Sequence, residues 1–246
     1  MPRQSGDVRD PGSSGEKAAT VAIIPAFNEE GTIEHVVNHV LTYLDHVVVI
    51  DDGSTDSTAA IAEMAGVKVI SHVLNRGVGA AMRTGYRYAC EHGFVFILQL
   101  DGDGQHDPKY IPEFLQAIDS GFDIVIGSRF IDLSYQQYSF VRRAGIRFFT
   151  HLCNLLSARK LTDITSGFRA YRTEALRKLE RNQDKHWAVE QTLEAARKGL
   201  RIKELSVDMP TRAQGTSQFR LGVFLWYPIR MLDVILRVLI FRGWKR

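Results

Sequence analysis

Residues 20–127 alternate between short apolar runs and longer amphipathic segments, and this alternation constrains the fold more than any other feature. The apolar runs have the character of buried strands, and the amphipathic segments have the spacing of helices. Strands that alternate with helices form mainly parallel sheets with right-handed crossovers. The predicted strands are 20–25, 46–51, 67–73, 94–100 and 123–127. The predicted helices are 32–44, 78–92 and 108–120, together with a further helix before residue 67 that Ser54 or Thr55 is expected to cap.

The pattern changes after Gly127. Residues 128–139 are polar and aromatic and predict a loop, whereas 162–171 predict a polar turn that leads into a strand. The remaining predicted elements are helices at 141–156 and 190–198 and a strand at 200–207. Residues 1–19 lack the apolar run of a signal peptide and predict a disordered tail, so the main domain is expected over 20–218.

The C-terminal segment 219–246 contains the most apolar stretch of the chain, Leu221–Phe241. On an insertion scale its apolar residues contribute about −6 kcal/mol, and three charged residues contribute about +9 kcal/mol, so a membrane span is disfavoured. The charged residues share one helical face, and the predicted apolar face holds Leu232, Ile235, Leu236 and Leu239. An amphipathic helix of this kind lies on a membrane surface or packs against protein, and the sequence leaves both open.

The charge balance excludes one class of partner. The chain has 246 residues with 31 Lys and Arg against 28 Asp and Glu, a net charge of +3. This excess is too small to indicate nucleic-acid binding. The two cysteines, Cys90 and Cys153, are expected to be buried thiols rather than a disulfide.

An acidic run, Asp101-Gly-Asp103-Gly-Gln105-His-Asp107, directly follows the predicted strand 94–100. Pro108 is expected to begin a helix that Asp107 caps. Two carboxylates about 5 Å apart repel by roughly 3 kcal/mol at an effective dielectric of about 20, so a partly buried cluster needs a cation. Oxygen ligands suit Mg²⁺ or Mn²⁺.

The glycines of the acidic run and its histidine allow two further predictions. Gly102 and Gly104 carry no side chain, so a bulky ligand is expected to approach the backbone there. His106 is a lone histidine beside Gln105, and a structural role is expected for it rather than metal ligation.

Polar side chains also follow the first and second predicted strands, in Pro25–Glu30 and Asp51–Asp56. In doubly wound sheets the first and fourth strands are neighbours, and ligands bind at the carboxyl ends of the strands. Acids at the second strand end suit ribose hydroxyls and base N–H groups, and those at the fourth suit a metal that bridges a diphosphate. Together they predict a nucleotide-diphosphate ligand.

The ordered motifs IPAFNEE, VIDDGSTD, NRGVG, LDGDGQHDP and GSR resemble those of glycosyltransferase family 2. The segment Asp163-Ile-Thr-Ser-Gly-Phe-Arg169 narrows the resemblance to enzymes that transfer sugars to polyprenyl phosphates. The resemblance implies an α/β fold of the GT-A nucleotide-diphospho-sugar transferase type, with a Rossmann-like, mainly parallel sheet and amphipathic C-terminal helices.

The resemblance also assigns roles to residues that match the family motifs. It implies that the nucleotide sugar is bound by Pro25, Asn28, Glu29, Asp52, Arg76, Gly77 and Asp101. It implies that Mg²⁺ or Mn²⁺ is held by Asp101, Asp103 and Gln105. Catalytic roles fall to Asp101, Asp103 and Arg129, and the candidates for the acceptor phosphate are Arg129, Arg143 and Arg212.

The expected activity is therefore metal-dependent transfer of a hexose, with inversion, from a nucleotide diphosphate sugar such as GDP-mannose or UDP-glucose to polyprenyl phosphate. The expected location is peripheral, at the cytoplasmic face of the membrane, with a membrane partner protein or a homo-oligomer left open. A lipid phosphate is already ionised near neutral pH and needs no general base.

Three rival functions remain. A saccharide hydroxyl acceptor would need a base, for which Asp163 and Glu190 are candidates. The chain could also be a non-catalytic nucleotide-sugar-binding subunit. A nicotinamide site at Gly77-Val-Gly79 is disfavoured, because the third fingerprint glycine is replaced by Met82.

Overall fold

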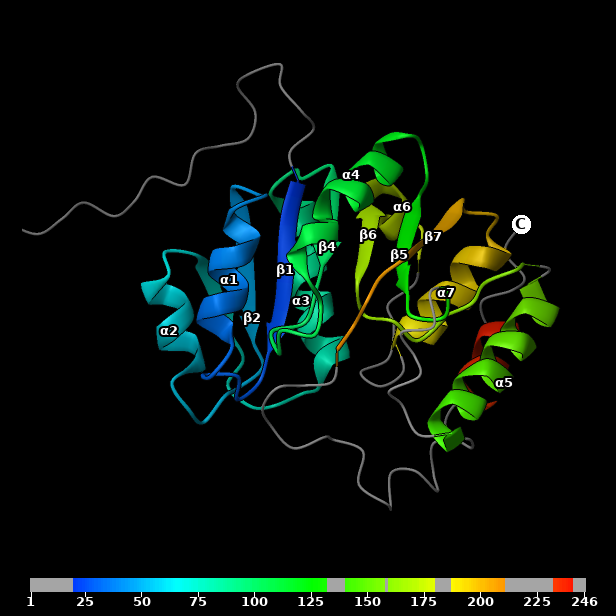
Figure 1. Ribbon diagram of the computed structural model, residues 1–246, viewed down its shortest axis with the longest axis horizontal. Helices are drawn as coiled ribbons and strands as arrows, with labels where there is room; N and C mark the ends of the chain where they lie inside the picture. The colour runs from blue at the N-terminus through cyan, green and yellow to red at the C-terminus, as the bar shows by residue number, and fades with distance from the viewer. Residues whose placement is uncertain (1–19, 132–139, 158, 180–186, 211–231, 241–246) are drawn as a thin grey trace, which may run out of the picture.

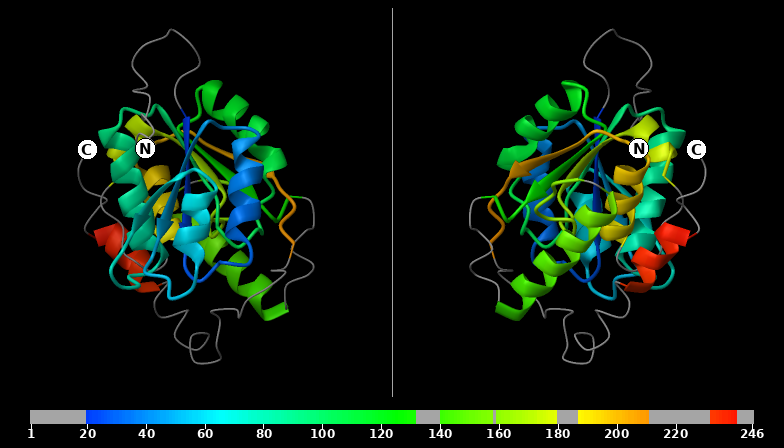
Figure 2. Two further views of the ribbon diagram at one scale, coloured as in Figure 1. Left: turned by 90° about the vertical axis from the view of Figure 1, so that its left-hand side faces the viewer. Right: turned by 90° about the vertical axis from the view of Figure 1, so that its right-hand side faces the viewer.

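The computed structural model describes residues 20–131, 140–157, 159–179, 187–210 and 232–240. One central sheet is covered by helices on both faces, as the two side views show (Figures 1 and 2). The predicted tail 1–19 and the C-terminal segment apart from 232–240 lie outside the described residues.

Within these ranges seven strands form one sheet in the order β3-β2-β1-β4-β6-β5-β7. Their bounds are β1 Thr20–Ala26, β2 His46–Asp51, β3 Lys68–Ser71, β4 Phe96–Gln99, β5 Ile124–Ser128, β6 Arg169–Arg172 and β7 Ile202–Ser206. The β1–β2, β1–β4, β2–β3 and β5–β7 pairs are parallel, which confirms the mainly parallel sheet. β6 is antiparallel to both β4 and β5.

The helices cover the two faces of the sheet because its side chains alternate between them. Ala22 and Ile24 of β1 pack in the core that includes residues of α1, α2 and α4. Val21 and Ile23 pack in the opposite core with α3, α6 and α7. The bounds are α1 Ile33–Leu41, α2 Thr58–Met64, α3 Val78–Glu91, α4 Ile111–Asp119, α6 Thr173–Arg177 and α7 Trp187–Arg197.

A third apolar cluster lies outside α7. There α5 (Phe140–Ser157) contributes Phe149 and Cys153, and the helix 232–240 contributes Ile235 and Val238. This packing explains why all residues of α7 from Trp187 to Ala196 are buried. None of the helices described is long and apolar enough to cross a membrane.

Protein packing covers only part of the predicted apolar face of the C-terminal helix. Val234, Ile235 and Val238 are buried, and Leu239 packs against the same cluster. Leu232 and Leu236, on the same predicted apolar face, are 45% and 53% exposed. Contact with α5 and α7 determines which side chains of this helix are buried. Helical periodicity by itself does not specify them.

Two helix starts also differ from the prediction. α2 begins at Thr58 after Ser57, so neither Ser54 nor Thr55 caps it. The expected helix from Pro108 begins with a 3-10 turn, Pro108–Tyr110, before α4. Its predicted cap is confirmed, because the Asp107 carboxylate accepts a hydrogen bond from Lys109 N at 3.0 Å.

We expect Gly85→Ala to destabilise the fold by about 1–3 kcal/mol, because a Cβ there would overlap the Ile23 side chain where α3 packs on β1. Gly145→Ala, also inside a helix, is the matched control, because its Cβ would meet open space. The control should be neutral or gain up to about 1 kcal/mol in helix propensity. Urea denaturation measures both, and equal midpoints for the two variants would contradict the packing of α3 on β1.

Candidate functional site

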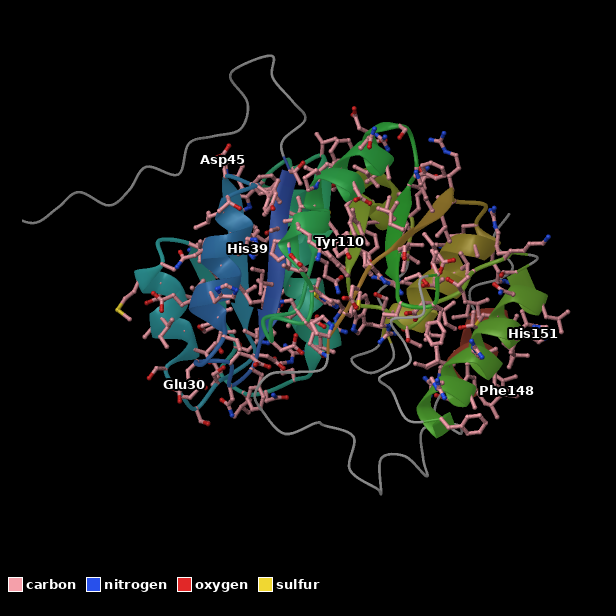
Figure 3. The ribbon with its side chains drawn as sticks, in the orientation of Figure 1. Glu30, His39, Asp45, Tyr110, Phe148 and His151 are labelled. Carbon is pink, nitrogen blue, oxygen red and sulfur yellow. The ribbon has the colours of Figure 1, made fainter. Side chains whose placement is uncertain are left out.

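The carboxyl ends of β1, β2 and β4 lie at one edge of the sheet, because these strands are parallel neighbours. The predicted adjacency of the first and fourth strands is therefore confirmed. Figure 3 shows Glu30, in the loop after β1, at this edge, and Asp45 at the opposite end of α1. The three acidic or amide-bearing loops of the sequence therefore leave the sheet side by side.

The loops after β1 and β2 are joined by reciprocal hydrogen bonds. Asn28 N donates to Ser54 Oγ at 3.0 Å, and Thr55 N donates to Asn28 Oδ1 at 2.8 Å. Asn28 has a φ of 55°, a left-handed conformation that asparagine adopts more readily than most residues. Ser54 and Thr55, predicted to cap a helix, thus hold the two loops together, and Asn28 organises the edge through its own amide.

Asp52 lies at the centre of a second loop contact. Its carboxylate is nearly buried, and it accepts hydrogen bonds from Arg76 N at 3.1 Å and Gly77 N at 2.6 Å. These bonds draw the loop between β3 and α3 against the end of β2. The structure thus brings together Asp52, Arg76 and Gly77, three of the residues predicted to bind the nucleotide.

Gly53 makes this approach possible. Its φ is 75°, and a Cβ there would lie 2.7 Å from Leu74 C. Both the left-handed backbone and the close approach of the neighbouring main chain require glycine at this position.

The loop after β4 carries the predicted metal ligands. Asp103 is buried and its Oδ1 accepts from Gln105 N at 3.0 Å, while Asp101 is partly exposed. Gln105 Nε2 donates to Pro210 O at 2.7 Å. This bond orients the Gln105 amide, and its Oε1 is the end that could serve as a ligand.

The structure corrects the prediction that a ligand approaches the backbone at Gly102. The face on which a side chain would lie is filled by protein, with Pro25 O and Ala26 Cβ both 3.3 Å from an added Cβ. The missing side chain therefore allows the loop to pack against β1 rather than admitting a ligand. Gly104 has a φ of 75°, which explains a glycine at that position.

His106 makes structural contacts beneath Asp101. Its Nδ1 accepts a hydrogen bond from Asp101 N at 2.9 Å, so the ring hydrogen of neutral His106 lies on Nε2. The ring stacks on Phe168 with a centroid distance of 5.1 Å, and Phe168 stacks on Phe114 at 4.4 Å. The histidine thereby links the acidic loop to the residues that precede β6.

Those residues approach Asp101 closely. A Cβ at Gly167 would lie 3.2 Å from Asp101 Oδ2, so the segment before β6 borders the acidic loop. The resemblance singled out this segment as a motif, and its antiparallel strand places it beside the acidic loop at the same edge.

Arg129 and Asp163 form a buried ion pair. Arg129 Nε lies 2.6 Å from Asp163 Oδ2, Nη2 lies 2.9 Å from Oδ1, and Nη2 also donates to Thr165 Oγ1 at 2.7 Å. Burial acts to raise the pKa of the Asp163 carboxyl, but the Arg129 charge and the hydrogen bonds from Arg129 and Thr165 outweigh it, and the pKa is lowered. Asp163 is therefore an ionised anchor for Arg129, and its lowered pKa makes it a weak proton acceptor.

Glu204 of β7 holds the backbone that carries Asp163. Its carboxylate accepts from Thr162 N at 2.7 Å and from Asp163 N at 2.8 Å. Burial raises the pKa of Glu204, and these hydrogen bonds offset the rise only in part. Glu204 was not predicted as a site residue, because β7 becomes a neighbour of residues 162–163 only in the folded chain.

The other predicted phosphate ligands are less defined. Arg143 lies half-exposed on α5, and Arg212 lies outside the described residues. Their grouping with Arg129 stays a prediction. Glu190, the second candidate base, is 1% exposed on α7, and its role stays a prediction.

Among the described residues, protein side chains alone do not form a metal cage at the site. The described part of the chain contains no group of three or more histidine, cysteine, aspartate or glutamate side chains arranged to hold a metal ion. Two carboxylates and one amide oxygen on the loop after β4 are nevertheless a suitable donor set for Mg²⁺, which commonly binds one or two carboxylates and completes its coordination with substrate phosphates and water.

Comparison with known proteins identifies the family of this chain. The family model for glycosyl transferase family 2 matches residues 21–197. The undecaprenyl-phosphate mannosyltransferase of Micrococcus luteus is 31% identical, over 82% of this chain and 88% of that protein. The polyprenol monophosphomannose synthase of Mycolicibacterium smegmatis is 28% identical, over 88% of this chain and 86% of that protein.

A solved structure has the same fold. The glucosyl-3-phosphoglycerate synthase of Mycobacterium tuberculosis, in complex with Mn²⁺ and UDP-glucose, matches 87% of this chain and 78% of its own with a TM-score of 0.67 at 20% identity. Because the family model covers more than half of the sequence and the fold matches that of this solved structure, the chain belongs to glycosyl transferase family 2 and is a glycosyltransferase with the GT-A fold.

Proposed function

We propose that this enzyme transfers a hexose from a nucleotide diphosphate sugar to polyprenyl phosphate, with inversion and with Mg²⁺ or Mn²⁺. The observation that carries the proposal is the meeting of three polar loops at the carboxyl edge of β2, β1 and β4. The acceptor class is supported by relatives whose names specify undecaprenyl phosphate and polyprenol monophosphomannose.

The donor would lie across these loops, with its nucleoside near Pro25, Asn28, Glu29 and Asp52 and its diphosphate toward Arg76, Gly77 and the acidic loop. The hydrogen bonds among the loops support this assignment, because they fix the edge before a ligand arrives. Binding to such a preorganised edge loses less conformational freedom than binding to mobile loops.

Asp101, Asp103 and Gln105 would hold the metal ion. When bound, the ion supplies positive charge that neutralises the diphosphate leaving group. Gln105 would use Oε1 for this purpose, which is compatible with its Nε2 hydrogen bond to Pro210 O. His106 would keep Asp101 in place through the bond to Asp101 N.

The reaction would be a single displacement. A phosphate oxygen of the acceptor forms a bond to the anomeric carbon while the bond from that carbon to the donor diphosphate breaks. Because a phosphate monoester is ionised near neutral pH, no base has to remove a proton. Arg129 would attract the acceptor phosphate, and Asp163 keeps its guanidinium in a fixed orientation.

The acceptor lipid requires the enzyme to work at a membrane surface, and we propose that α5 and the helix 232–240 contact the cytoplasmic face. α5 contains no acidic residue. Its Phe148 is 61% exposed and its Leu155 is 74% exposed, and Phe148 and His151 project away from the sheet (Figure 3). Leu236 and Ile240 on the second helix are 53% and 62% exposed. Exposed apolar side chains together with cations are typical of interfacial helices.

We expect purified protein with Mn²⁺ to form a glycolipid from undecaprenyl phosphate and labelled GDP-mannose or UDP-glucose. Asp103→Asn should abolish this transfer, because the variant removes a carboxylate charge from the proposed metal site. Product formation is measured by thin-layer chromatography of the lipid extract.

Asp107→Asn is the matched control for this experiment. Asp107 lies on the same loop but caps a 3-10 turn, and asparagine caps as well as aspartate, so activity should persist. Transfer to an oligosaccharide with none to the lipid would contradict the acceptor, and full activity of Asp103→Asn would contradict the metal ligands.

We expect Asp163→Asn to destabilise the protein by about 3–5 kcal/mol, because it leaves the buried Arg129 guanidinium without its counter-charge. Since the folded-state pKa of Asp163 is lowered, its contribution is present above the unfolded pKa of about 3.9 and is lost as pH falls through the folded value. The difference between wild type and variant should therefore be constant from neutral pH to about pH 5 and shrink below about pH 4.

Chemical denaturation across this pH range measures the effect. Asp233→Asn is the control, because the Arg237–Asp233 pair is exposed and should contribute at most about 1 kcal/mol. A similar small change for both variants would rule out a buried, ionised Asp163.

Replacing Phe148 and Leu155 together by serine should weaken binding to anionic vesicles by at least about tenfold, because each side chain would lose apolar burial in the lipid. Met64→Ser is the control, since Met64 is 79% exposed on α2, on the far side of the sheet from α5. Cosedimentation with anionic and zwitterionic vesicles measures the partition. Wild-type protein that binds neither vesicle would argue against α5 as a membrane contact.

A further inference from the structure

His72 is the residue immediately after β3, and its ring lies between the end of β2 and helix α3. Its backbone N donates to Asp51 O at 2.8 Å, which continues the pairing of β2 with β3 by one residue. Its Nδ1 lies 2.7 Å from Asp52 Oδ1, and its Nε2 lies 2.9 Å from Thr84 Oγ1. The His72 side chain is 11% exposed, so this chain of contacts is largely shielded from water.

The donors and acceptors in this chain have defined directions. An ionised carboxylate can only accept, so Nδ1 of His72 carries a hydrogen and donates it to Asp52. The Asp52 carboxylate then receives this bond together with those from Arg76 N and Gly77 N. In neutral His72, Nε2 accepts from the Thr84 hydroxyl, which ties the ring to α3.

The consequence is that His72 restrains the rotation of the Asp52 carboxylate. Arg76 and Gly77 immediately precede α3. Because their backbone N–H groups donate to the Asp52 carboxylate, their positions depend on the position of that carboxylate. A shift of Asp52 would therefore move the whole segment 72–77 relative to the ends of β1 and β2.

We propose that His72 is a positioning residue of the donor site, which sets affinity for the nucleoside diphosphate by orienting Asp52 and through it the Arg76–Gly77 segment. This inference rests on the proposed donor site. His72 acts through Asp52 and does not take part in the chemical step, so its effect falls on donor binding rather than on turnover at saturating donor.

The test compares His72→Leu, which removes both ring hydrogen bonds, with His72→Asn, whose amide can still donate to Asp52. Titration calorimetry with GDP and with UDP, each with Mn²⁺, measures binding of the nucleoside diphosphate. We expect His72→Leu to weaken binding of the preferred nucleotide by about tenfold, equivalent to about 1.4 kcal/mol, and His72→Asn to recover most of that loss.

Steady-state kinetics provide the second measurement. In His72→Leu the KM for the donor sugar should rise by the same factor, while kcat and the KM for undecaprenyl phosphate stay unchanged. His92→Leu is the matched control, because His92 follows the far end of α3 and stacks on Tyr88, away from the site. Thr84→Val is a further variant that keeps the side-chain volume and should weaken nucleotide binding in the same direction by a smaller factor.

The outcomes separate this inference from the proposed function. If wild-type protein binds neither nucleotide, the proposed donor site fails and this role of His72 fails with it. If wild type binds and His72→Leu binds equally well, or if His72→Asn recovers nothing, only the positioning role is overturned. If His72→Leu does not fold, unchanged nucleotide binding by Thr84→Val overturns the role.

Discussion

The parallel pairing of β1 with β2 on one side and β4 on the other is the constraint on which the rest of the molecule depends. β1 is buried on both faces, so its backbone groups must be satisfied by these neighbours. The main-chain hydrogen bonds also continue past the strands. Asp52 N donates to Ala26 O at 2.8 Å, and Gly102 N donates to Pro25 O at 3.3 Å. The loops that carry the candidate site are therefore extensions of the sheet.

Polar side chains at this edge have two distinct structural environments. Asn28 and Asp52 receive hydrogen bonds from neighbouring loops and so hold the edge together. Asp101 is partly exposed on a loop that His106 and Phe168 support from below. These contacts fix the loop that carries Asp101 and Asp103, the proposed ligands of the cation.

The Arg129–Asp163 pair illustrates how desolvation and charge compete in a buried ion pair. Burial penalises the Asp163 carboxylate, yet the charge of Arg129, two hydrogen bonds from its guanidinium and two from Thr165 keep it ionised. Glu204 adds backbone contacts that hold residues 162 and 163 in place. An arginine held in this way loses little conformational freedom when it meets a phosphate.

Much of the architecture could be predicted from periodicity, because the strands β1, β2 and β4 are apolar runs and α1, α3 and α4 have clear apolar faces. The acidic loop and the cap that Asp107 provides for the following helical turn could also be predicted, because a cap depends on local chemistry. The roles of Ser54 and Thr55 were predicted wrongly. Both residues are good helix caps in isolation, and only the adjacent loop after β1 provides the competing partner, Asn28.

By itself the sequence determined the alternation of strands and helices and the residue types at each strand end, because these follow from local periodicity and short-range chemistry. Tertiary structure alone decided that β6 inserts antiparallel between β4 and β5, that Asp163 is an anchor for Arg129, and that His72 reaches Asp52. Each of these depends on contacts between residues 20 or more positions apart in the chain. Such contacts form only when burial of the two cores brings the segments together, and no local pattern encodes them.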